Sequence, residues 1–265
     1  MNMNENLIIN WYKTIDSTNL QAMRDKDIAT DRTVWAAEYQ TAGRGQRGNK
    51  WLGEKSMNLA FSILFKPNNL KASEQFKISM ISALGVCEYL KEYGVDAKIK
   101  WPNDIYVGDK KICGMLIENS IVADRLSLSV SGIGININQR SFDPTLPNPT
   151  SLSLVLNKTD KSDLFDLKEE LIKVLRHIFY LYDNMYLLKE KYLSRLYRLE
   201  GYYKYEEIPE MDALIPNTFA AIPSECKGKI IEACIEGVDS NGCIILKTKD
   251  GEVKTYAFKE IKYIL

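Results

Sequence analysis

The chain has 265 residues, of which 45% are hydrophobic and 26% charged, a composition typical of globular proteins that excludes disordered and collagen-like chains. Lys and Arg together number 35, as do Asp and Glu, and this balance disfavours a protein that holds DNA through excess positive charge. No apolar run reaches the roughly 18 residues of a membrane span, so we expect no membrane partner.

Cysteine and histidine usage indicates a reducing compartment and argues against a zinc site. The chain starts without the basic and apolar regions of a secretory signal. The cysteines are odd in number and form no C-x-x-C motif, and His177 is the single histidine, so we expect buried free thiols and a cytoplasmic location. The cysteines are Cys87, Cys113, Cys226, Cys234 and Cys243.

The N-terminal part of the sequence predicts strands separated by helices. Asp16 and Ser17 offer a cap for a helix that runs to about Arg24. Ser73 offers a cap for a second helix over 74–93, which ends at Gly94. The strand-like segments are 7–15, 33–39 and 58–65.

A meander of strands follows the second helix. Pro102 interrupts its first strand, and Gly108-Asp109 has the form of a two-residue hairpin turn. The predicted strands are 97–101, 105–107, 110–118 and 125–138. Strands paired by hairpins, with helices inserted between them, predict an α+β fold with a mixed, mainly antiparallel sheet.

A loop and a long helical segment come next. Residues 139–150 contain three prolines, which predicts a loop. Apolar residues then recur every seven positions over 164–199, which indicates one long helix or two with a break near Asp183-Asn184. Polar gaps in this stripe favour packing on the sheet over a dimeric coiled coil, and we expect His177 to be structural.

The C-terminal part predicts a second, smaller unit. Short strands are expected at 229–236, 243–247 and 253–258, separated by turn residues, and such spacing predicts a small β-barrel. We place the boundary between about Leu199 and Ala213, which divides the chain into units 1–208 and 209–265.

The loop Gly43-Arg44-Gly45-Gln46-Arg47-Gly48-Asn49-Lys50-Trp51 is rich in glycine and positive charge. It matches G-x-G-x-x-G but leads into a strand, whereas a dinucleotide site needs a helix there. Asn49 also breaks the pattern of a phosphate-binding G-x-x-x-x-G-K loop. A flexible loop with guanidinium and ammonium groups remains, which suits a nucleotide phosphate; the alternative is a solvated hairpin loop.

Two further stretches have the chemistry of a binding site. Lys100 precedes Trp101, Pro102, Asn103 and Asp104, and a lysine beside an amide and a carboxylate suits phosphate and Mg²⁺. Alternation along the strand 125–138 places Gly132, Gly134 and Asn136 on one face, which is therefore nearly free of side chains. Such a bare strand face predicts the close approach of a flat ligand or of another backbone.

Together these motifs resemble those of biotin protein ligases, over residues 10–140 closely and over the C-terminal barrel more loosely. In chain order they are S-T-N at 17–19, Gln40 with G-R-G-x-R-G at 43–48, K-W-P-N-D at 100–104, K-x-x-G at 111–114 and G-x-G-x-N at 132–136. The resemblance implies a class II synthetase-like catalytic domain.

The resemblance also implies a reaction and its partners. Biotin and MgATP would give biotinyl-adenylate and pyrophosphate, and the adenylate would acylate a lysine on the biotin carrier domain of a carboxylase. Some relatives carry an N-terminal helix-turn-helix, but here the ligase pattern starts by about residue 8. We therefore expect a monofunctional ligase with no DNA partner, and a homodimer stays open.

The resemblance assigns roles to individual residues. Lys111, Arg44 and Lys100 are the expected catalytic residues, Trp51 would stack on adenine, and Asp104 would help to place Mg²⁺. Arg44 would hold the biotin carboxylate and phosphate, and Lys111 would contact the carbonyl and the α-phosphate. The remaining substrate-binding residues are Ser17, Thr18, Asn19 and Gln40 at the biotin ring, Gly43, Gly45, Gln46 and Arg47 in the loop, Asn103, Gly114, Gly132 and Gly134 at the floor, and Asn136 near the nucleotide.

One departure and three alternatives accompany this interpretation. Many relatives have arginine where this loop has Gln46, so less positive charge would contact the adenylate here. A lipoate or octanoate ligase or transferase has a similar catalytic fold, although such proteins usually lack K-W-P-N-D. A non-catalytic binding module and a DNA-binding regulator are the other two alternatives, and the second is disfavoured by the balanced charge.

Overall fold

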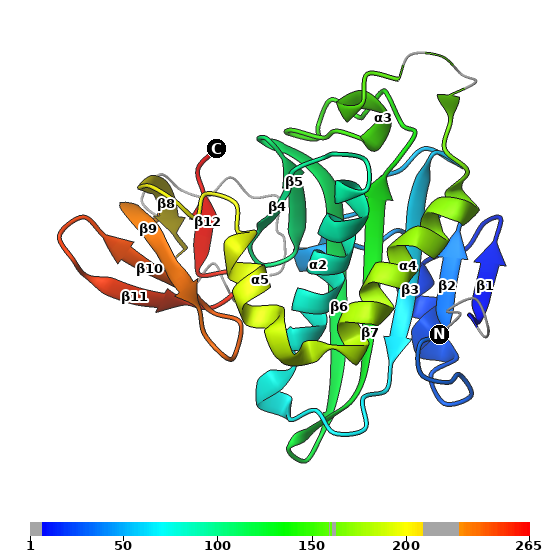
Figure 1. Cartoon of the computed structure of the whole chain (residues 1–265), viewed down its shortest axis with the longest axis horizontal. Coiled ribbons are helices and arrows are strands. Elements are labelled where there is room, and N and C mark those ends of the chain that lie inside the picture. Colours follow the sequence, from blue (N-terminus) through cyan, green and yellow to red (C-terminus); the bar gives the residue numbers. More distant parts are fainter. Residues whose placement is uncertain (1–6, 159, 161–162, 209–227) are drawn as a thin grey trace.

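The computed structural model describes residues 7–158, 160, 163–208 and 228–265 and places them in two sheets, with helices packed on the larger one (Figure 1). The larger sheet has seven strands in the order β1-β2-β3-β7-β6-β5-β4. β1 and β2 are parallel, and all other neighbours in this sheet are antiparallel. The predicted α+β class with a mixed, mainly antiparallel sheet is confirmed. The strands are β1 (Ile9–Tyr12), β2 (Val34–Ala37), β3 (Asn58–Phe65), β4 (Ala97–Lys100), β5 (Asp104–Val107), β6 (Lys110–Val122) and β7 (Arg125–Asn136).

Helices cover both faces of this sheet. The helices are α1 (Thr18–Arg24), α2 (Phe76–Lys91), α3 (Leu152–Val155), α4 (Leu167–Asp183) and α5 (Leu188–Ser194). α2 and α4 pack against each other on the face nearest the viewer in Figure 1. Because successive strand residues point to opposite faces, Val34 joins the core under α2, while Trp35 and Leu64 pack with Ala22 of α1 on the other face.

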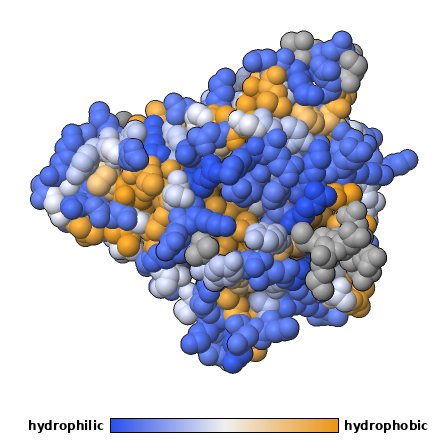
Figure 2. All heavy atoms as spheres, in the orientation of Figure 1, coloured by the Kyte–Doolittle hydropathy of each residue, from blue (hydrophilic) through white to orange (hydrophobic). Residues whose placement is uncertain are grey.

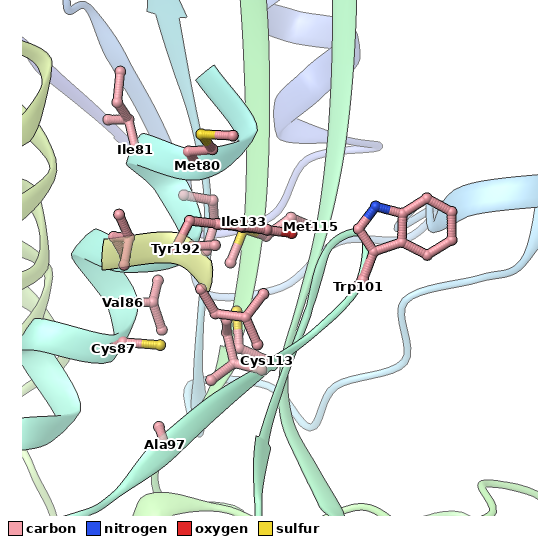
Figure 3. Close-up of a cluster of buried hydrophobic side chains, with 14 of the residues drawn as sticks. Met80, Ile81, Val86, Cys87, Ala97, Trp101, Cys113, Met115, Ile133 and Tyr192 are labelled. Carbon is pink, nitrogen blue, oxygen red and sulfur yellow. The ribbon is translucent and has the colours of Figure 1, made fainter. Parts of the chain in front are cut away.

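α2 is apolar on nearly all sides because it lies between the larger sheet and the helices α4 and α5. In Figure 3 Met80 and Cys87 of α2 lie on the side of Met115, Cys113 and Ile133, whereas Trp101 points away from α2. Trp101 is nevertheless only 4% exposed, because it is covered from the opposite side by the C-terminal sheet. Trp101, in the turn after β4, is therefore buried between the larger sheet and the C-terminal sheet.

The helix boundaries confirm one alternative and correct one cap. The segment expected over 164–199 is two helices with a break at Asn184, and α4 packs on α2. Gly94 follows α2 with a φ of +72°, as expected for a glycine that ends a helix. The N-cap predicted at Ser73 is wrong, since Gln75 occupies that position. A short 3-10 turn over Ala72–Glu74 intervenes before the helix, so Ser73 lies too far upstream.

The C-terminal residues form a five-stranded antiparallel sheet, in the order β11-β10-β9-β8-β12. Its strands are β8 (Tyr203–Glu207), β9 (Ile230–Val238), β10 (Ile244–Thr248), β11 (Val253–Tyr256) and β12 (Ile261–Tyr263). Within the described residues no pairing joins the edge strands β11 and β12, so we describe an open sheet. β8 precedes residue 208 and belongs to this sheet, while the division into units 1–208 and 209–265 stays a prediction.

Specific contacts hold the second sheet against the first. The Trp101 Nε1 donates a hydrogen bond to the Gly242 carbonyl at 2.8 Å, and its ring meets that of Phe258 edge-on with centroids 6.3 Å apart. Gly242 also packs closely against the ring of Phe76. The Arg198 Nη1 donates to the Ile264 carbonyl at 2.7 Å. The turn between β9 and β10 is thereby fixed beside Trp101 and Phe76, and the end of the chain beside Arg198.

The surface of the helical face is mostly hydrophilic, with apolar residues showing over the C-terminal sheet at the left of the view (Figure 2). Ile230 and Val253 are among the exposed apolar side chains of that sheet. In the described part of the chain, none of the helices combines the length and apolar character that a membrane span requires.

Candidate functional site

A cavity of about 380 Å³ lies on the sheet face that carries α1, and its volume is typical of small-molecule sites. It is lined by the start of α1, Gln40 with the glycine-rich loop, Phe61 of β3, the turn after β4, β6 and β7 with their glycines, and the end of the C-terminal sheet. Among the predicted site residues whose side chains the structure describes, all except Gly43 and Asn136 line this cavity. The motifs that are separated in the sequence therefore meet at one place.

The polar wall of the cavity is built at the N-terminus of α1. Ser17 is the N-cap residue, as predicted. The backbone N–H and the hydroxyl of Thr18 both donate to Gln40 Oε1, at 2.8 and 3.2 Å. The Ser62 hydroxyl lies 2.7 Å from Thr18 Oγ1 and 2.6 Å from Asn19 Oδ1. These contacts fix donors and acceptors before any ligand arrives, which reduces the ordering cost of binding.

The floor of the cavity is the side-chain-free strand face predicted from alternation. A Cβ on Gly134 would lie 2.3 Å from Trp51 Cε2, and one on Gly132 would lie 1.9 Å from Asn19 Oδ1. A Cβ on Gly114 would lie 3.0 Å from Lys111 Nζ. A side chain at Gly132 or Gly134 would displace these neighbouring groups, so the expected close contact is present. In this structure the groups on the floor are the chain's own indole and amide.

The glycine-rich loop is a closed hairpin with a short 3-10 turn over Gln46–Gly48. The N–H of Gly45 donates to the Asn49 carbonyl at 2.7 Å, and the N–H of Trp51 donates to the Gly43 carbonyl at 3.0 Å. Gly43 is buried and lines a neighbouring cavity of about 600 Å³ instead of the first one. The side chain of Arg47 lies outside the described part of the structure, so its predicted role is not placed.

Arg44 projects from this loop to the rim of the cavity. Its Nη1 lies 3.0 Å from Glu118 Oε1, and the two side chains are 42% and 30% exposed. Gln46 also lines the cavity and, within the described residues, its Oε1 is buried without a hydrogen-bond partner. The guanidinium of Arg44 thus already faces a carboxylate, whereas the amide oxygen of Gln46 has no hydrogen-bond partner among the described residues.

Positive charge gathers at the end of the cavity nearest the C-terminal sheet. Lys111 Nζ lies 2.7 Å from Asp104 Oδ1. The Lys100 ammonium donates to Tyr106 Oη at 3.1 Å and lies between the rings of Tyr106 and Tyr263, 4.9 and 5.3 Å from their centroids. Burial lowers the pKa of Lys100 below its ordinary value. This end suits the binding of phosphate groups.

Two predicted asparagines have structural contacts. Asn103 donates through Nδ2 to the Met115 carbonyl, which holds the turn after β4 against β6 while Asn103 still lines the cavity. Asn136 is buried, does not line the cavity, and donates through Nδ2 to the Thr150 carbonyl at 2.9 Å. Its amide fastens the loop 139–150 to β7, and its place near the nucleotide stays a prediction.

Some cavity residues were missed from the sequence. Phe258, Ile261, Lys262 and Tyr263 belong to the C-terminal sheet or the turn before β12 and line the cationic end. They carry no motif, and only the docking of the two sheets brings them near Lys100. No sequence pattern predicts that these residues line the cavity, because a three-residue strand such as β12 is too short to show periodicity.

The acidic groups set a limit on metal binding. Asp104 is the carboxylate residue among those that line the cavity. Across the described residues no group of three or more His, Cys, Asp or Glu side chains is placed to hold a metal ion. One carboxylate suits Mg²⁺ only when phosphate oxygens and water complete the coordination shell. The donor set therefore fits a cation that is delivered together with a polyphosphate.

Comparisons with known proteins agree with this geometry. Residues 11–136 match the model of the Biotin/lipoate A/B protein ligase family. The bifunctional ligase/repressor BirA of Escherichia coli is 29% identical over 248 residues, which are 93% of this chain and 71% of that protein. The biotin–[acetyl-CoA-carboxylase] ligase of Paracoccus denitrificans is 31% identical over 125 residues, covering 46% of this chain and 51% of that one.

A solved structure is similar over nearly the whole chain. The biotin protein ligase of Aquifex aeolicus in complex with biotin and ATP is 27% identical and has a TM-score of 0.72. The similarity covers 97% of this chain and 99% of that one. It therefore includes the C-terminal sheet as well as the seven-stranded sheet.

Proposed function

Because residues 11–136 match the model of the Biotin/lipoate A/B protein ligase family, we propose that the chain is a biotin–protein ligase, which activates biotin with ATP and transfers it to a lysine of a carrier domain. The observation that carries the proposal is the single cavity in which a polar wall, a glycine floor and a cationic end meet. The Aquifex aeolicus protein, solved with biotin and ATP, has the same fold at 27% identity.

The first step forms a mixed anhydride. A carboxylate oxygen of biotin attacks the α-phosphorus of ATP, the bond to the bridging oxygen breaks, and pyrophosphate leaves with its electron pair. Negative charge spreads over the phosphoryl oxygens as this happens, and preorganised donors stabilise it. Arg44 would hold the attacking carboxylate, Lys111 the α-phosphate, and Lys100 the departing phosphates.

Binding of the two substrates divides the cavity. Thr18 and Gln40 offer a hydroxyl and an amide to the polar ring of biotin, and the indole of Trp51 offers a flat surface to adenine. Asp104 would contact a Mg²⁺ ion that arrives with the triphosphate, and that ion would supply charge neutralisation to the phosphates. The Lys111–Asp104 ion pair keeps both groups at the same point of the cavity.

The second step needs no nucleophile from this protein. The lysine amine of the carrier attacks the acyl carbon, AMP leaves, and the enzyme contributes by holding the two reactants together. Water must be excluded meanwhile, and the glycine-rich loop and the loop 139–150, with Phe142, both line the neighbouring cavity. A carboxylase carrier domain is the proposed partner.

The thiols support a reducing location for this reaction. Cys87 and Cys113 are buried and free, as expected, whereas Cys234 and Cys243 are free but only partly buried. Cys226 lies outside the described residues. Unpaired thiols persist in the cytoplasm, so we place the protein there.

Pyrophosphate release tests the proposal against the lipoate alternative. The protein is incubated with MgATP and either biotin or lipoate, and pyrophosphate is measured for each acid. We expect release with biotin and at most a trace with lipoate. If pyrophosphate is released with lipoate and not with biotin, the protein is a lipoate ligase. If it is released with neither acid, the protein is a non-catalytic binding module.

A substitution at Lys111 tests the assigned chemistry. Removing one donor to a transition-state oxyanion costs about 10²-fold or more in rate, so Lys111→Ala should reduce adenylate formation by that factor. Lys110→Ala is the matched control, because Lys110 is an exposed neighbour on β6. Near-normal pyrophosphate release by Lys111→Ala would remove this lysine from the mechanism.

A further inference from the structure

Glu118 on β6 carries a carboxylate that contacts two residues of the cavity. Its Oε1 lies 3.0 Å from Arg44 Nη1, and its Oε2 accepts a hydrogen bond from Asn19 Nδ2 at 2.9 Å. The guanidinium comes from the glycine-rich loop and the amide from α1. One side chain of β6 therefore links two segments that close around the cavity.

The amide of Asn19 has defined partners at both ends. Its Nδ2 donates to the Leu116 carbonyl at 3.2 Å as well as to Glu118, and its Oδ1 lies 2.6 Å from the Ser62 hydroxyl. A glutamine in place of Glu118 would still offer an amide oxygen to Asn19. The two contacts of Glu118 can thus be separated, since glutamine lacks the charge that Arg44 pairs with.

The contact with Arg44 has the chemistry of a ligand contact. A guanidinium binds a carboxylate through charge-assisted hydrogen bonds, whether that carboxylate belongs to a side chain or to a bound acid. In this structure Glu118 is the carboxylate on Arg44. A ligand that brings its own carboxylate must displace Glu118 or lie beside a second negative charge.

We propose that Glu118 occupies the place on Arg44 that the ligand's carboxylate takes when it binds. Glu118 thereby sets how strongly the site prefers neutral over anionic forms of its ligand. This proposal rests on the proposed function, in which Arg44 binds the carboxylate of biotin. Glu118 is a positioning residue, because it acts through Arg44. Its charge weakens the binding of biotin and leaves the binding of an uncharged analogue unaffected.

The partial exposure of the Arg44–Glu118 ion pair limits how much Glu118 can change the affinity for biotin. Arg44 and Glu118 are 42% and 30% exposed, so water screens their interaction. Exposed ion pairs change equilibria by a factor of up to about five. We therefore expect Glu118→Gln to tighten biotin binding about two- to fivefold.

Calorimetry with two ligands tests the proposal on the intact chain. Biotin is compared with biotinol, in which a CH2OH group replaces the carboxylate, for the wild type and for Glu118→Gln. Glu232→Gln is the matched control, because Glu232 pairs with Lys249 in the C-terminal sheet at 2.7 Å. The expected result is tighter binding of biotin, unchanged binding of biotinol, and no effect of Glu232→Gln.

A double substitution shows whether the effect passes through Arg44. In an Arg44→Met background, Glu118→Gln should leave the biotin affinity unchanged. The proposal is overturned if Glu118→Gln changes both ligands equally, weakens biotin, has no effect, or tightens biotin as much without Arg44 as with it. Failure of the wild type to bind biotin at all contradicts the proposed function itself, which is a different result.

Discussion

The indole of Trp51 and the amide of Asn19 lie where the glycines of β7 leave the sheet bare. Alternation along β7 predicted that surface, because Gly132 and Gly134 point to the same side. It could not predict which groups cover the surface, since Trp51 and Asn19 come from distant parts of the sequence. A strand face without side chains can therefore be predicted from the local sequence, whereas the groups that pack on it are set by the tertiary fold.

Lys100 differs from an ordinary surface lysine because two tyrosine rings enclose it. Burial lowers its pKa from the ordinary value of 10.5, so its ammonium loses the proton at a lower pH. If Lys100 binds the phosphates of ATP, the KM for ATP should rise with pH before an ordinary lysine would titrate. In Lys100→Arg the guanidinium stays charged, and that rise should disappear.

The pH profile of the KM for ATP, compared between wild type and Lys100→Arg, checks this prediction. Lys110→Arg is the control, since Lys110 is exposed and should leave the wild-type profile unchanged. Parallel profiles for wild type and Lys100→Arg would show that the Lys100 charge does not contribute to ATP binding.

Helices and strands with strong periodicity were predictable, and short or unusually packed ones were not. The seven-residue repeat over 164–199 predicted helix, because the apolar face spans several turns, and it left open one helix or two with a break near Asp183-Asn184, of which the structure has two. β8 and β12 were missed, and the three residues of β12 are too few to carry a pattern. The repeat also gave no sign that Glu170, a charged residue of α4, is buried against α2.

Glu170 connects α4 to α2 through hydroxyl groups. Its Oε2 accepts hydrogen bonds from the hydroxyls of Tyr89 and Tyr93 at 2.6 and 2.5 Å, and Lys173 Nζ lies 2.8 Å from its Oε1. The carboxylate raises the pKa of Tyr89, as does the burial of that ring, which is the larger cause. The two helices thus share a buried polar contact within an apolar interface.

Replacing this carboxylate should destabilise the fold. Glu170→Leu leaves the buried Tyr89 hydroxyl without its acceptor, which costs about 1–3 kcal/mol in the free energy of unfolding. Urea denaturation measures this loss, and Glu169→Leu, at an exposed position one residue earlier, should cost much less. If Tyr89→Phe in combination with Glu170→Leu recovers none of the loss, the unpaired hydroxyl is not its cause.

The C-terminal sheet completes the cavity that lies on the seven-stranded sheet. Lys262 and Tyr263 of β12 line the same space as Lys100, and the Trp101–Gly242 hydrogen bond holds the two sheets together. The sequence predicted a small β unit and the motifs of the larger one. It could not predict their docking, because the contact joins a motif residue to a turn that has no motif.

Two glycines at turns of the second sheet allow a matched test of this docking. Gly242 has a φ of +90° and a Cβ there would lie 2.4 Å from the Phe76 ring, whereas Gly251 has a φ of +91° and would meet nothing within 4 Å. Both substitutions to alanine cost about 1–2 kcal/mol in backbone strain. Gly242→Ala should cost about 1–3 kcal/mol more, because the sheets must separate to relieve the clash.

Substrate kinetics then distinguish docking from general stability. Gly242→Ala should raise the KM for ATP severalfold and leave the affinity for biotin nearly unchanged, since β12 lines only the cationic end of the cavity. Gly251→Ala should alter neither. Equal effects of the two substitutions on the KM for ATP would indicate that the second sheet does not contribute to the ATP site.

The most direct test of the account is mass spectrometry of a biotin carrier domain incubated with this protein, biotin and MgATP. One lysine of the carrier should gain one biotinyl group, and this gain should disappear without ATP and be strongly slowed in Lys111→Ala. An unmodified carrier, together with no pyrophosphate release above that of ATP alone, would contradict the claim that this cavity makes and transfers an acyl-adenylate.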